Sequence, residues 1–108
     1  MKLIYTKSYN KNIKYLKNRV FEKKLLDEIL YYIKKQPNFS TMINDPLSNL
    51  YRLERLKYEL SDYYSFRLSK VIRLIIKPSD NNIEVYLVYI SKDHYNDFSE
   101  DKVILDEE

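Results

Sequence analysis

Two arginines, Arg67 and Arg73, lie in short runs that alternate as β-strands do, YYSFRL and VIRLIIK. If Ser69 to Val71 form a three-residue turn, the two arginines pair directly across neighbouring strands and point to the same face of the sheet. Two guanidinium groups on one face repel each other unless an anion or carboxylates lie between them, and guanidinium groups match phosphate oxygens well. The spacing therefore predicts a phosphate site.

The only histidine of the chain, His94, is followed by Tyr95 and comes directly after a third strand-like run, IEVYLVYIS. A short turn, PSDNN, joins this run to the one before it, so the three runs are expected to form an antiparallel meander. In a meander the last strand returns to the edge that carries the first turn. We therefore expect His94 and Tyr95 to lie close to Arg67 and Arg73.

These residue types suit the cleavage of RNA by its own 2′-hydroxyl without a metal ion. That reaction needs a base for the 2′-hydroxyl proton, a cation for the charged phosphorane and an acid for the departing 5′-oxygen. Histidine exchanges protons near neutral pH, and either Glu54 or Glu59 is available as the base. Tyr63 and Tyr95 are candidates to stack on bases of a single strand.

The composition indicates one soluble domain. The chain has 108 residues, no cysteine and one histidine, so it has no disulfide, no thiolate metal site and no ligand set for a structural zinc. No apolar run approaches the roughly 18 residues that cross a bilayer, so a cytoplasmic protein without metal, cofactor or membrane partner is expected. Residues 1–108 are interpreted as a single domain.

Charge is distributed unevenly along the chain. Residues 1–95 carry 18 Lys and Arg against 10 Asp and Glu, whereas residues 96–108 carry six acidic residues against one lysine. A basic body favours a polyanionic partner, although a merely solvated lysine-rich surface would have the same composition. Residues 96–108 are predicted to form a solvated acidic extension, the alternative being that they fold back on the basic face and limit access to it.

The elements that must position these residues give an α+β fold. An N-terminal strand over residues 1–5 precedes a helix capped by Thr6 or Ser8, and a second helix starts at Val20 and ends before Pro37. The apolar stripe of the second helix is predicted to be core: Val20, Phe21, Leu25, Leu26, Ile29, Leu30 and Ile33. Residues 36–48 are interpreted as a loop that includes a helical turn, and residues 49–60 fit either a helix or a strand. The two helices are expected to pack as a hairpin on a twisted, mostly antiparallel sheet.

Four segments resemble the RelE/ParE toxin superfamily, most closely its YoeB-type mRNA interferases. They are MKLIYTKSY at the start, ERLKYELSDYYSFRL from Glu54, RLII from Arg73, and the pair His94–Tyr95. The resemblance implies a RelE-like fold with Glu54 as general base and Arg73 as the phosphate-stabilising arginine. It implies that His94 and Tyr95 act in acid catalysis and substrate positioning.

The same resemblance places Lys57 and Arg67 at supporting basic positions of substrate binding, to which the stacking argument adds Tyr63. It implies the toxin of a type II toxin–antitoxin system, an endoribonuclease that cleaves mRNA on the ribosome and is neutralised by a cognate antitoxin. The alternatives are a ParE-like toxin that inhibits gyrase and a non-catalytic RNA-binding module on the same fold. The YoeB branch ends at the His–Tyr pair, whereas 13 residues follow it here.

Overall fold

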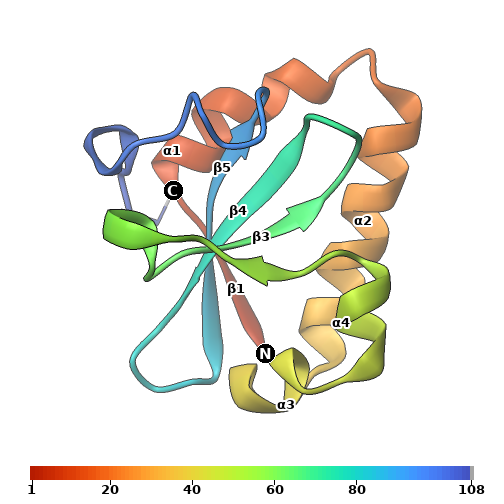
Figure 1. The fold of residues 1–108 in the computed structure, drawn as a ribbon, viewed down its shortest axis with the longest axis vertical. Helices are drawn as coiled ribbons and strands as arrows, with labels where there is room; N and C mark the ends of the chain where they lie inside the picture. The colour runs from red at the N-terminus through yellow and green to blue at the C-terminus, as the bar shows by residue number, and fades with distance from the viewer. Residues whose placement is uncertain (108) are drawn as a thin grey trace.

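The computed structural model, which describes residues 1–107, contains a five-stranded sheet in the order β1-β5-β4-β3-β2 (Figure 1). β1 is parallel to β5 and the other neighbouring strands are antiparallel, as the α+β prediction requires. The strands are β1 (Lys2–Tyr5), β2 (Glu54–Arg55), β3 (Tyr64–Arg67), β4 (Arg73–Pro78) and β5 (Glu84–Ser91). The α-helices are α1 (Lys7–Asn12), α2 (Val20–Lys35), α3 (Phe39–Ile43) and α4 (Pro46–Leu50), and the 3-10 turns are η1 (Ile13–Leu16), η2 (Tyr58–Leu60) and η3 (Glu100–Lys102).

Side-chain caps begin three of the four α-helices. Thr6 Oγ1 accepts a hydrogen bond from the Tyr9 amide (3.1 Å) and donates one to the Leu87 carbonyl (2.6 Å), which ties the start of α1 to β5. Asn38 and Asp45 cap α3 and α4 in the same way. Residues 36–48, predicted as a loop with one helical turn, therefore contain α3 and the start of α4, because each segment has its own capping residue.

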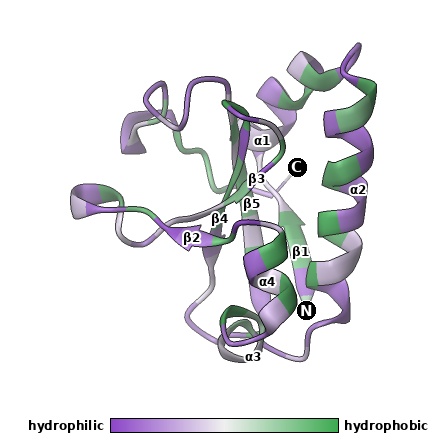
Figure 2. Cartoon of the chain, turned by 45° about the vertical axis from the view of Figure 1, so that its right-hand side comes forward, coloured by the Kyte–Doolittle hydropathy of each residue, from purple (hydrophilic) through white to green (hydrophobic). Residues whose placement is uncertain are grey.

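α2 covers one face of the sheet, and its buried residues join strand residues such as Phe66 and Leu74 in the main core. Hydrophobic and hydrophilic residues alternate along this helix (Figure 2). The predicted stripe is wrong at its start: Phe21 is 84% exposed and Val20 69% exposed. Tyr32, which the stripe omitted, is buried instead. No helix within the described residues is long and apolar enough to span a membrane.

The opposite face of the sheet carries a second core, which the C-terminal extension completes. Phe98 is 5% exposed and packs with Tyr63, Ile75, Val88 and Leu56, while Val103 and Leu105 of the extension are partly buried against this cluster. The extension then reaches α1, where the Lys7 amide donates to the Asp106 carbonyl (2.9 Å). Figure 1 shows this segment, in blue, on the side of the sheet away from α2.

The prediction of a solvated extension is therefore wrong. Its acidic residues suggested a solvated end, but its apolar side chains pack on the face of the sheet away from α2. Burial of those side chains removes apolar surface from water and gives the segment a fixed place.

Candidate functional site

Arg67 ends β3 and Arg73 begins β4, and the two residues are direct cross-strand partners. Their side chains therefore share one face, as the strand alternation predicted. The turn between the strands is closed by the Leu68 amide, which donates to the Ile72 carbonyl (2.9 Å). Residues 69–71 form the predicted three-residue connection.

Arg73 is buried (4% exposed) and holds the turn together from within. Its Nη1 donates to the carbonyls of Ser69 (2.8 Å), Lys70 (3.1 Å) and Ile72 (3.3 Å). Burial and then the like charge of Arg67 lower the pKa of Arg73, while Glu54 and Tyr95 raise it. Arginine nevertheless remains protonated in proteins, so a positive charge is held at this sheet edge.

His94 lies directly beside Arg73, with Arg73 Nη2 3.0 Å from His94 Nδ1. Arginine can only donate, so Nδ1 is the acceptor and the ring proton resides on Nε2. The His94 amide also donates to the Val71 carbonyl (2.9 Å), which joins the end of β5 to the β3–β4 turn. The prediction that the third strand returns His94 to the arginines is thus confirmed.

The backbone that carries His94 and Tyr95 is strained. Both residues have left-handed conformations, with φ of 51° and 68°, although neither is glycine. Such conformations cost about 1–3 kcal/mol each and persist only where the surroundings enforce them. Tyr95 is half-buried against the second core, whereas His94 as a whole residue is exposed.

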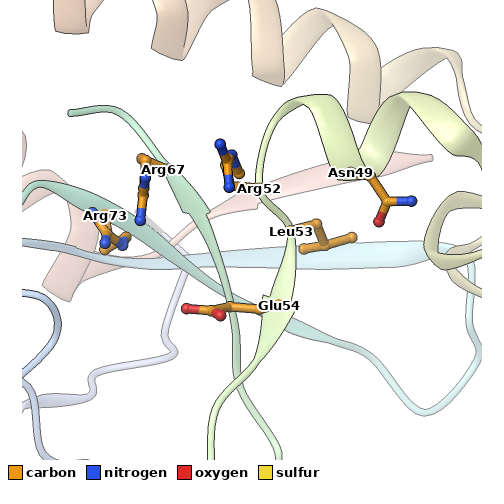
Figure 3. Close-up of a pocket in the computed structure, with 6 residues that line it drawn as sticks. All are labelled: Asn49, Arg52, Leu53, Glu54, Arg67 and Arg73. Atoms are coloured by element: carbon orange, nitrogen blue, oxygen red, sulfur yellow. The ribbon is translucent and has the colours of Figure 1, made fainter. Parts of the chain in front are cut away.

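An open pocket of about 320 Å³ is lined by Asn49, Arg52, Leu53, Glu54, Arg67 and Arg73. Neither His94 nor Tyr95 lines it, but it includes the arginine that His94 contacts. Figure 3 shows Arg67 and Arg73 at one end of the pocket, and the Glu54 carboxylate projects toward them from β2. Residues 1–107 contain two salt bridges, Lys2–Glu84 and Arg19–Glu22, and neither involves the pocket. Three guanidinium groups thus face one carboxylate, an arrangement that suits a phosphate group.

Glu54 and Glu59, the two candidate bases, lie in different places. Glu54 is paired with Ser65 across β2 and β3, lines the pocket, and acts electrostatically on Arg73. Glu59 lies in η2, is exposed, and does not line the pocket. The structure therefore brings Glu54, and not Glu59, to the arginines.

Two of the predicted substrate-binding residues lie away from the pocket. Lys57 is exposed just before η2 and is not among the pocket residues. Tyr63 is 2% exposed, its ring centroid lies 5.2 Å from that of Phe98, and Lys77 Nζ lies 5.7 Å from its centroid. The prediction that Tyr63 stacks on bases is wrong, because neighbouring side chains already cover its ring.

Arg52 is one of three pocket residues that the sequence did not indicate. It follows α4 in a left-handed conformation (φ 57°), outside any helical or strand periodicity. The only available signal was its position two residues before Glu54, and Arg55 is closer still to Glu54 in the sequence. Asn49 also lines the pocket and gave no signal at all.

A scan against protein-family models found no match to this chain, and no curated protein matches it. Solved structures do match. A metal-bound toxin from Helicobacter pylori superposes with a TM-score of 0.64 at 21% identity, covering 91% of this chain and 99% of that one. A YoeB/ParE toxin from Agrobacterium tumefaciens gives 0.61 at 16% identity, over 85% and 98% of the two chains.

The YoeB of a YoeB–YefM complex from Staphylococcus aureus gives a TM-score of 0.57 at 24% identity, over 84% of this chain and 94% of that one. At these identities the likeness establishes the fold. The chain has the fold of the RelE/ParE toxin superfamily, whose solved examples include YoeB and YafQ toxins.

Proposed function

We propose that this chain is the toxin of a type II toxin–antitoxin pair and cleaves mRNA as an endoribonuclease. The observation that supports this most is the pocket in which Glu54 faces Arg67 and Arg73, together with the contact of 3.0 Å between Arg73 and His94. The fold is consistent with this function, since toxins share it. We further propose that residues 1–108 act as one toxin domain in the cytoplasm, where mRNA and ribosomes are found.

In the proposed reaction the scissile phosphate binds between the arginines. Hydrogen bonds within residues 1–107 account for Nη1 of Arg73 and one Nη2 hydrogen, so Nε–H and the second Nη2 hydrogen remain for phosphate oxygens. Glu54 takes the proton of the 2′-hydroxyl, whose oxygen attacks phosphorus. The guanidinium groups stabilise the negative charge that builds up on the phosphorane.

His94 protonates the departing 5′-oxygen in this scheme. Delivery of a proton requires the cationic ring, and a cationic ring cannot accept a hydrogen bond from Arg73. The 3.0 Å contact must therefore open when substrate binds, as phosphate oxygens take over the Nη2 donor and release Nδ1, which then takes up a proton from water. The products are a 2′,3′-cyclic phosphate and a 5′-hydroxyl.

The proposed partners are mRNA on the ribosome and a cognate antitoxin. The S. aureus YoeB was crystallised with YefM, and the YafQ of Escherichia coli was crystallised in the DinJ–YafQ toxin–antitoxin complex. By analogy, an antitoxin would bind this chain and block access of RNA to the arginine pocket. A small adjacent reading frame that encodes such a protein would support this assignment.

The assignment of the base is tested with Glu54→Gln and the matched variant Glu59→Gln. Because general-base catalysis contributes roughly 10²–10⁴-fold, Glu54→Gln is expected to lower the cleavage rate by about that factor. Glu59→Gln, outside the pocket, is expected to cleave like the wild type. The measurement is cleavage of translated mRNA, with the end groups of the products determined.

Three results would contradict the proposal in different ways. Cleavage unaffected by Glu54→Gln would rule out the base. Growth arrest with intact transcripts and a DNA-damage response would favour a gyrase-directed toxin. RNA binding without any cleavage would leave a non-catalytic module on the same fold.

A further inference from the structure

The seven-residue turn from Ser91 to Asp97 carries the whole His94–Tyr95 pair. Because both members of the pair have positive φ, the turn would relax if nothing held it. The β3–β4 turn supplies one support, the Val71 carbonyl that accepts from the His94 amide. The other supports come from the two ends of the turn itself.

Asp97 closes the turn through its carboxylate. One oxygen accepts from the Ser91 hydroxyl and the other from the Lys92 amide (3.0 Å). Ser91 Oγ in turn accepts from the Tyr95 amide (2.7 Å). Ser91 is fully buried and pairs directly with Arg73 across β5 and β4. This strand pairing fixes the start of the turn next to the arginine that His94 contacts.

Phe98 fixes the position of Asp97. Its ring packs 5.2 Å from Tyr63 and 5.4 Å from Tyr89, measured between centroids. The Phe98 amide also donates to the Tyr95 carbonyl (3.1 Å), which continues the turn into the extension. The C-terminal extension thus supplies both the carboxylate and the apolar anchor.

We propose that Asp97, acting through Ser91, is a positioning residue that keeps the turn carrying His94 and Tyr95 beside Arg73, whether or not the contact between His94 and Arg73 is made. Asp97 makes no hydrogen bond or salt bridge to His94 or Arg73 within the described chain, so its effect is indirect. The catalytic part of this inference rests on the proposed ribonuclease function. The geometric part is independent of that function, because the position of the His94 ring can be measured in the protein without RNA.

The experiment compares Asp97→Ala with Asp101→Ala, which removes one carboxylate from an exposed position of the same extension. His94 is the only histidine, so the imidazole ¹⁵N signals of the protein belong to it alone. The wild type and Asp101→Ala are expected to show the tautomer with the proton on Nε2. Asp97→Ala is expected to show a mixture of both tautomers, because the contact with Arg73 is no longer enforced.

The kinetic expectation is a fall of about 10- to 100-fold in kcat for Asp97→Ala with KM changed less than about twofold, since misplacement of a catalytic group costs rate. Asp97→Asn, which keeps one acceptor oxygen and the same size, is expected to recover part of kcat and of the Nε2–H signal. If Asp97→Ala does not fold, the tautomer and kcat of Asp97→Asn decide whether Asp97 positions His94. Wild-type tautomer and wild-type kcat in both Asp97 variants would overturn the proposal.

Failure of the proposed function has a different signature. If the wild type cleaves no RNA, the ribonuclease assignment fails, while the tautomer measurement still decides whether Asp97 positions His94. Suppose instead that the wild type cleaves RNA and that Asp97→Ala shows the same His94 tautomer as the wild type. The positioning role of Asp97 then fails, and the ribonuclease assignment stands.

Discussion

Arg73→Ala is expected to reduce RNA cleavage by roughly 10²–10³-fold, the usual effect of removing one group that stabilises charge in a transition state. Arg73 is suited to this role because burial at 4% exposure keeps water from competing for its donors. Arg73→Lys is expected to lose nearly as much activity. An ammonium group cannot donate to the turn carbonyls and to a phosphate in the planar fork geometry of arginine. The measurement is the single-turnover rate on translated mRNA.

Arg67→Ala is the control that separates the loss of a positive charge in the pocket from the loss of structural hydrogen bonds. Arg73 also donates to three turn carbonyls, so its removal loosens the β3–β4 turn and the placement of His94. Arg67 faces the same pocket from the paired position but is exposed. Its removal is expected to weaken RNA binding and leave the midpoint of urea unfolding unchanged. Full activity in Arg73→Ala, with the protein folded, would refute the phosphate site.

The arginine pair and its approach to His94 could be predicted because strand alternation has a strict period of two. Once Arg67 and Arg73 flank a three-residue turn, their shared face follows, and a second short turn returns β5 to the same edge. Glu54 was harder to assign. Only the structure shows that residues 54–55 pair with β3 while Glu59 lies in η2, because LERLKYEL fits a helix and a strand equally well.

The wrong predictions concern residues whose surroundings the sequence pattern does not give. Strand alternation predicts the face of the sheet on which a side chain lies, but not which other segments cover that face. Tyr63 was predicted to share the face of Arg67, yet the C-terminal extension buries Tyr63 and leaves Arg67 exposed. Asp97 was counted only as a negative charge, although it closes the turn that carries His94. Phe21 fitted a helical stripe, but its side chain is exposed and is not part of the main core. Each error concerns a contact that the periodicity of a helix or strand does not encode.

Phe98→Ala is expected to lower the free energy of unfolding by about 3–5 kcal/mol, the range for removal of a buried phenylalanine side chain. Phe98 is 5% exposed and joins the extension to Tyr63 and Tyr89 across the second core. The matched control is Phe21→Ala, the same substitution at a side chain that is 84% exposed. It is expected to change the free energy by no more than about 0.5 kcal/mol. Urea denaturation of both variants provides the comparison.

Truncation after Asn96 extends the same test to the whole extension. It removes Asp97 and Phe98 together with the contacts to α1, so a loss of stability larger than that of Phe98→Ala is expected. If truncation instead left stability unchanged, the extension would be the solvated acidic end that its charge suggested. A truncated protein that is less stable and also cleaves RNA more slowly would show that one segment supports both the second core and the His94 turn, because both effects start from the contacts of adjacent residues.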